Sequence, residues 1–141
     1  MNDLYDDALV ALAKAKDGAG RLDAPDGTAS VDNPLCGDRV TIDVTLDGAR
    51  VDGFAQKARG CILTQAAAGM IARHAHGLDA GDIEALRARV RDFLSSAGDG
   101  ADWPEMALFE PVRTVRSRHD CVLIAFDALL EATRKARDER A

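Results

Sequence analysis

Hydrophobic and polar residues alternate most regularly in the middle of the chain. Residues 40–46 follow the period of a half-buried β-strand, and residues 50–58 bring the chain back alongside it. Asp47-Gly48 lies between them and is typical of a two-residue turn, because both central positions favour positive φ. We expect Gly53 to mark a bulge in the returning strand. With a short strand at 28–31, the pattern predicts a small antiparallel sheet of about three strands.

Apolar residues recur at helical spacing elsewhere in the chain. Helices are expected over residues 4–16, 62–76, 79–96 and 115–137, with a helical turn at 106–112. The second of these is rich in alanine, so another element should pack close to its backbone. The fold class is therefore α+β, with the sheet packed against several helices in a single domain over residues 1–141.

Composition and charge narrow the classes of function. Hydrophobic residues make up 47% of the 141 residues, and the net charge of -6 argues against nucleic-acid binding as the main role. No apolar run is long enough for a membrane span, and the first residues lack the pattern of a signal peptide. The expected compartment is a reducing cytoplasm, where an odd number of cysteines points to thiol or metal chemistry.

The three cysteines and one aspartate are the candidate site residues. Cys36 and Asp38 flank Gly37 in a loop, where glycine allows a sharp backbone path. Cys61 lies at a strand-to-helix junction, where exposed helix N–H groups favour a thiolate. Cys121 lies early in the last helix, close in sequence to several arginines. Three thiolates and one carboxylate make a complete tetrahedral set for zinc, and thiolates equally suit an iron–sulfur cluster.

Simpler interpretations exist for each of these residues. A lone cysteine is usually a small buried hydrophobe, and this applies most directly to Cys121 on its apolar helix. Cys61, before an alanine-rich helix, is open to the same interpretation. Asp38 also suits a turn, where its side chain would bond to local backbone.

Three motifs together resemble the U-type iron–sulfur assembly family, which includes IscU, SufU and the N-terminal domain of NifU. They are Asn33-Pro34-x-Cys36-Gly37-Asp38, Gly60-Cys61 followed by the small-residue helix through Met70, and Arg118-x-x-Cys121. The motifs occur in the family's order and the similarity spans residues 20–131. The SufU-like branch fits best. An extra helical insertion covers about 77–105, Arg118 stands three residues before the last cysteine, and Asp120 replaces the histidine of the IscU branch.

The resemblance implies a zinc site formed by Cys36, Asp38, Cys61 and Cys121. It also implies a partner, a pyridoxal-phosphate cysteine desulfurase of the SufS type, whose persulfide sulfur Cys36 would accept. Arg118 would stabilise the thiolate or persulfide, and downstream iron–sulfur assembly proteins would receive the sulfur. Two alternatives remain open at this point: a scaffold that assembles a [2Fe–2S] cluster on iron at the same residues, and a structural zinc domain that only binds a partner.

Overall fold

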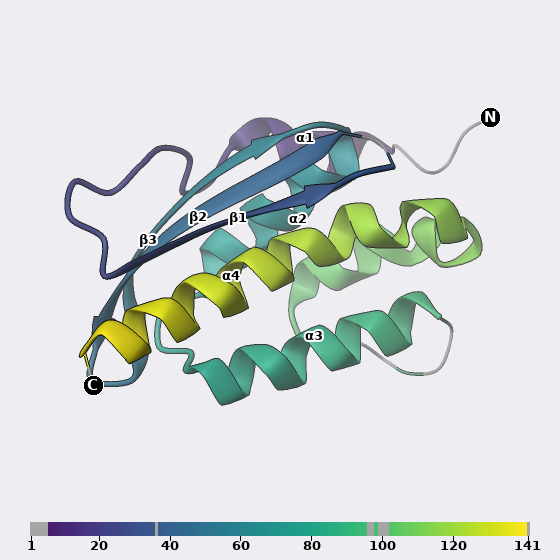
Figure 1. The fold of residues 1–141 in the computed structure, drawn as a ribbon. Helices are drawn as coiled ribbons and strands as arrows, with labels where there is room; N and C mark the ends of the chain where they lie inside the picture. Colours follow the sequence, from purple (N-terminus) through teal and green to yellow (C-terminus); the bar gives the residue numbers. More distant parts are fainter. Residues whose placement is uncertain (1–5, 36, 96–97, 99–101, 141) are drawn as a thin grey trace.

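A computed structural model of the chain describes residues 6–35, 37–95, 98 and 102–140. It shows the α+β fold that the hydrophobic pattern predicted, a three-stranded antiparallel sheet with helices against one face (Figure 1). The strands are β1 (Gly27–Asn33), β2 (Asp38–Asp47) and β3 (Arg50–Arg59), and the α-helices are α1 (Asp7–Ala15), α2 (Ile62–His74), α3 (Ala80–Leu94) and α4 (His119–Arg140). Two 3₁₀ segments, Pro104–Thr114 and Arg116–Arg118, connect α3 to α4.

The sheet has the order β1-β2-β3, so each strand pairs with its neighbour in sequence. Asn33 pairs with Asp38 at one end of the sheet, and Arg39 pairs with Arg59 beside it. Asp47 pairs with Arg50, so the two-residue turn is Gly48-Ala49, one residue later than predicted. Gly48 has a φ of 64°, but Asp47 does not have the positive φ that was expected, because it is held in β2. The register between β2 and β3 shifts between Val44 and Leu46, opposite the stretch of β3 where a bulge was expected. The end that holds Asn33 and Asp38 leads into the cysteine-containing loop.

Apolar side chains of β2 face the helices and explain why the sheet is covered on that side. Val40, Ile42 and Val44 are fully buried. Helix α4 lies across β1 and β2, and α2 packs against β3 and α1. Figure 1 shows α4 between the sheet and α3. The small residues of α2 are buried beneath these neighbours, which confirms that other elements pack close to its backbone.

The last helix begins four residues later than its hydrophobic pattern indicated. Val115 has non-helical dihedral angles, φ −115° and ψ 80°, and the N–H of Arg118 bonds to the carbonyl of Val115 in a 3₁₀ turn. The preceding segment is also longer than the turn expected at 106–112. Its buried residues, Met106, Phe109 and Val112, recur every third position, which is the repeat of a 3₁₀-helix. Packing of that repeat displaces the start of α4 to His119.

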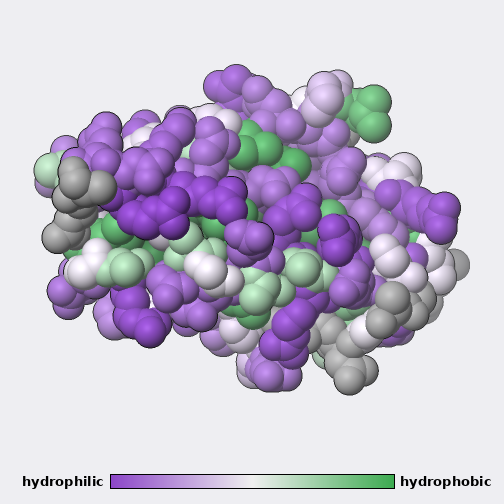
Figure 2. Space-filling model, turned by 60° about the horizontal axis from the view of Figure 1, so that its bottom comes forward, coloured by the Kyte–Doolittle hydropathy of each residue, from purple (hydrophilic) through white to green (hydrophobic). Residues whose placement is uncertain are grey.

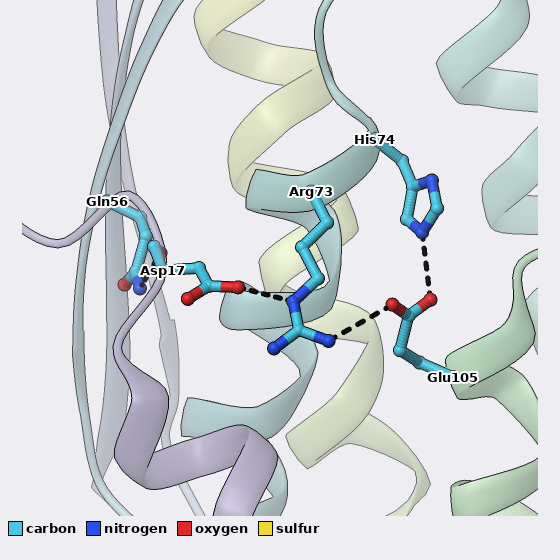
Figure 3. Close-up of polar contacts among 5 residues, drawn as sticks. All are labelled: Asp17, Gln56, Arg73, His74 and Glu105. Atoms are coloured by element: carbon cyan, nitrogen blue, oxygen red, sulfur yellow. Dashed lines mark hydrogen bonds and ion pairs between the residues drawn. The ribbon is translucent and has the colours of Figure 1, made fainter.

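A polar network fixes the loop between α1 and β1 against the rest of the fold. Arg73 contacts the carboxylates of both Asp17 and Glu105, and His74 Nε2 lies 2.8 Å from Glu105 Oε1 (Figure 3). Gln56 Nε2 donates to the carbonyl of Asp17 at 3.0 Å. Burial acts to raise the pKa of Glu105, but hydrogen bonds from His74 and Arg73 outweigh it and hold that pKa below its usual value. Loop, sheet and helix end are thereby joined.

The outer surface is largely polar. Figure 2 shows a face on which hydrophilic side chains predominate and apolar ones form small groups. Among the described residues, Leu35 is the large hydrophobic side chain that stands exposed, with 88% of its surface accessible. Within the same residues, no helix is both long and apolar enough to cross a membrane.

Candidate metal centre

Three of the four predicted ligands meet at one end of the sheet. Asp38 begins β2, Cys61 immediately precedes α2, and Cys121 lies in the first turn of α4. One ligand atom from each lies within 4.8 Å of the others. Asp38 and Cys121 are buried, and Cys61 is partly exposed. Residues that are far apart in the sequence thus form one cluster of two sulfurs and a carboxylate.

The Asp38 carboxylate is held by groups from the start of α2. The Thr64 hydroxyl donates to Asp38 Oδ2 at 2.6 Å, and the Cys61 backbone N–H donates to Oδ1 at 3.2 Å. Cys61 Sγ lies 3.4 Å from Oδ2. A buried carboxylate requires such partners, because an unsatisfied charge in the interior is costly. The arrangement turns the carboxylate toward the cysteine sulfur.

Gly60 explains how the backbone passes so close to this carboxylate. Its φ is +142°, and a Cβ placed there would lie 2.1 Å from Asp38 Oδ1. No larger residue fits without moving the carboxylate or the chain. The glycine before Cys61 therefore allows Asp38 and Cys61 to share one site.

Asn33 connects Cys121 to the loop that carries Cys36. Its side-chain Nδ2 lies 3.9 Å from Cys121 Sγ, and its Oδ1 accepts a hydrogen bond from the Leu35 N–H at 3.2 Å. Its carbonyl accepts a bond from the Gly37 N–H at 2.8 Å. An amide N–H directed at sulfur stabilises the thiolate form, which is the form that binds metal. Asn33 therefore shapes the loop and contacts the site.

The structure does not test the other predicted site residues, Cys36 and Arg118. Cys36 lies outside the described residues, so its position as a ligand stays a prediction. Arg118 is partly buried in the 3₁₀ turn that leads to Cys121, and its role also stays a prediction. Asp120 is exposed. His119 places Nε2 3.1 Å from the carbonyl of Val112 and is not part of the metal-binding group found among the described residues.

Sequence reasoning missed Thr64. It lies three residues after Cys61 on the same helix, and residues at that spacing share a face. A hydroxyl one turn after a candidate ligand was the available signal. What it contacts, the Asp38 carboxylate, follows only from the docking of α2 against β2.

The donor set suits a metal ion. Two cysteine sulfurs and one carboxylate oxygen are ligands that zinc accepts in tetrahedral sites, and thiolates also hold iron. With both thiols deprotonated, three anionic groups this close would repel one another strongly without a cation. A largely buried cluster of two cysteine sulfurs and one carboxylate therefore suits a metal ion. These ligand types do not distinguish zinc from iron.

Comparisons with known proteins agree with the fold and the motifs. The model of the family described as "NifU-like N terminal domain" matches residues 4–135. An iron–sulfur cluster assembly scaffold protein IscU from Thermotoga maritima is 24% identical over 135 residues, covering 94% of each chain. A protein of the same name from Streptococcus pyogenes is 25% identical over 142 residues, covering 96% of this chain and 86% of that one.

Solved structures give the same result. The N-terminal part of a NifU-like protein from Brucella abortus superposes with a TM-score of 0.90 at 30% identity, covering 97% of this chain and 96% of the other. A structure named as a SufU scaffold protein, from Fervidobacterium islandicum, gives a TM-score of 0.83 at 18% identity, over 92% of this chain and 96% of the other, which supports the fold. The chain belongs to the NifU-like N-terminal domain family, the iron–sulfur cluster assembly family of IscU and SufU.

Proposed function

We propose that this protein is a SufU-like sulfur acceptor that takes persulfide sulfur from a SufS-type cysteine desulfurase for iron–sulfur cluster assembly. The observation that carries the proposal is the convergence of Asp38, Cys61 and Cys121 within 4.8 Å, in a chain of this family. Zinc is the proposed metal, and Cys36 is the proposed fourth ligand. Zinc, when bound, would keep its cysteine ligands deprotonated and hence nucleophilic.

The proposed chemistry is a thiolate–persulfide exchange. The Cys36 thiolate attacks the outer sulfur of the partner's persulfide, one S–S bond forms as another breaks, and the donor cysteine leaves as a thiolate. No external oxidant is consumed, because the sulfur arrives at the oxidation level of the persulfide. Arg118, three residues before Cys121, would supply a positive charge near the developing anion.

Two features support the SufU-like branch over the IscU branch. Asp120 stands where the IscU branch has a histidine, and its exposed side chain adds no ligand. The segment 77–105 contains a full helix, α3, packed on α4. Both match the branch that the resemblance indicated.

The second candidate is a scaffold that assembles a [2Fe–2S] cluster on the same residues. The names of the Thermotoga maritima and Streptococcus pyogenes relatives favour it, because both are called scaffold proteins. Cysteine thiolates are the usual ligands of such clusters. The two candidates differ in what the purified protein should contain.

The first test is metal and acid-labile sulfide content after anaerobic purification without metal-affinity chromatography. About one zinc per chain and no sulfide is expected for the sulfur acceptor. Comparable amounts of iron and sulfide, with visible colour, would instead establish the scaffold.

The second test follows the sulfur itself. After incubation with a purified SufS-type desulfurase and cysteine, mass spectrometry of the Cys36 peptide should show the mass of one added sulfur atom. Peptides containing Cys61 and Cys121 are the internal control. An unmodified Cys36 peptide, with the desulfurase fully active, would contradict the proposed transfer.

A further inference from the structure

A groove of about 460 Å³ opens beside β3 and ends at Gly60, next to Cys61 of the candidate metal centre. One side is formed by α1 and the loop that follows it, the other by the end of β3 and the start of α2. Its lining runs to Gly60, the residue before Cys61, and to Gln65 on the first turns of α2. The groove is therefore an open path along a strand that leads to the candidate metal centre.

The floor of this groove is the outer edge of β3, which the loop pairs at Gln56 but leaves open at Ala58. The backbone N–H and carbonyl of Gln56 point away from β2, because they bond to Gly18 and Gly20 in the loop. Backbone groups alternate in direction along an antiparallel strand, so those of Ala58 also point away from β2. Among the described residues neither group of Ala58 has a hydrogen-bond partner. Ala58 thus presents one free donor and one free acceptor.

Positive charge lies along the same edge. Lys57 and Arg59 project from alternate positions of β3 and are exposed, and Lys16 is exposed across the groove. Within the described part of the chain, none of the three has a carboxylate within 4.0 Å. The neighbouring Arg39 differs, since it binds Asp32 at 2.6 Å. A chain with a net charge of -6 therefore carries a basic strip next to its site, in which Arg59 interacts with the Asp32 carboxylate only from a longer distance.

The far wall of the groove is preformed rather than loose. Arg73 binds the Asp17 carboxylate and Gln56 binds the Asp17 carbonyl, as Figure 3 shows, so the loop that lines the groove is tied to both α2 and β3. Arg21 further along the loop donates to Asp43 on β2 at 2.7 Å and 3.1 Å. A preformed wall lowers the entropic cost of binding an extended segment.

We propose that this edge of β3 is the docking track for an extended, acidic segment of the sulfur-donor protein. The segment adds beside Ala58 as a short strand, exchanges two backbone hydrogen bonds with it, and places carboxylates at alternate positions against Lys57 and Arg59. Cys61 is three positions after Ala58, roughly 10 Å in extended chain, so a segment bound along this edge is directed to the site. The identity of the partner rests on the proposed function.

The test measures binding of a purified SufS-type cysteine desulfurase. In the double variant Lys57→Glu/Arg59→Glu, the dissociation constant should rise about tenfold or more, and the effect should shrink as salt is increased. The matched control is Lys135→Glu/Arg137→Glu, the same pair of charge reversals at exposed positions near the end of α4. It should alter binding less than about twofold. Metal content and melting temperature should stay unchanged in both variants.

Backbone pairing has its own readout in amide hydrogen exchange. The Ala58 N–H should exchange rapidly in the free protein and become protected in the complex, while the Lys57 N–H is protected in both. Weaker binding of the double variant without protection of Ala58 would overturn the added strand. Equal binding of wild type and double variant would overturn the track while sulfur transfer to Cys36 still stood. Absence of binding to the wild-type protein would overturn both the partner and the track.

Discussion

Replacing Thr64 by valine tests how the Asp38 carboxylate is held at the candidate metal centre. Thr64 is fully buried, and its hydroxyl donates to Asp38 Oδ2 at 2.6 Å. Valine has nearly the same shape, so the substitution removes the hydrogen bond without opening a cavity. The carboxylate would then lose a charge-assisted hydrogen bond in a site with little access to water.

The expected magnitude follows from that contact. A hydrogen bond to a charged group contributes about 1.5–3 kcal/mol, so we expect Thr64→Val to cost roughly 2 kcal/mol. For a chain of 141 residues the entropy of unfolding is roughly 0.3 kcal/mol/K, which makes the melting temperature fall by about 7 °C. A group that orients a ligand also affects the metal, and zinc affinity in a chelator competition should fall about tenfold.

Thr133→Val is the matched control for this prediction. Thr133 is also buried in a helix, but its hydroxyl donates at 2.8 Å to the carbonyl of Leu129, which the helix already uses as an acceptor. The same chemical change should therefore cost less than about 1 kcal/mol and leave zinc affinity unchanged. Equal losses of stability in the two variants, measured by thermal and urea unfolding, would refute the special role assigned to Thr64.

Three further predictions concern the site and the sheet. Gly60→Ala should abolish zinc binding, because a Cβ would lie 2.1 Å from Asp38 Oδ1. The variant should still show the circular dichroism spectrum of the folded protein, and retained stoichiometric zinc would contradict the prediction. Removing metal with a chelator should lower the free energy of unfolding by several kcal/mol, since ligands from three elements are joined; an unchanged melting temperature would exclude that role. Asp43→Asn should lower the free energy of unfolding by about 2 kcal/mol at neutral pH. The buried Asp43 carboxylate depends on its partners, but its ion pair with Arg21 is screened by solvent because Arg21 is largely exposed. Burial acts to raise the pKa of Asp43, yet hydrogen bonds from Arg21, Thr28 and the Leu22 N–H outweigh it and lower that pKa. The greater stability of the wild type over Asp43→Asn should therefore be complete above about pH 4 and disappear as the pH falls further. A difference in stability that persists in strong acid would contradict this.

Local patterns were sufficient for the strands and for most helices. The alternation over residues 40–46 predicted β2, because one face of that strand carries the apolar residues packed against the helices and the other carries polar residues. The position of the turn followed from Gly48, whose positive φ needs no distant contact, although the turn is Gly48-Ala49 and not Asp47-Gly48 because Asp47 pairs with Arg50. The start of α4 was predicted four residues too early, because the 3₁₀ geometry before His119 is decided by how Phe109 and Val112 pack, which no local propensity encodes.

Residue chemistry alone indicated which side chains suit a metal, but it left open whether they meet. Cys121, taken by itself on an apolar helix, is equally a core residue, and it is indeed fully buried. Its role depends on α4 crossing the sheet so that its first turn reaches Asp38 and Cys61. The contact between Thr64 and Asp38 and the free edge of Ala58 could not be inferred, because a hydrogen-bond partner and an unpaired strand edge exist only once elements distant in sequence have packed. The sequence by itself determined the elements and the kinds of ligand, since those depend on neighbouring residues, and tertiary packing decided the site because proximity between remote segments is a property of the whole fold.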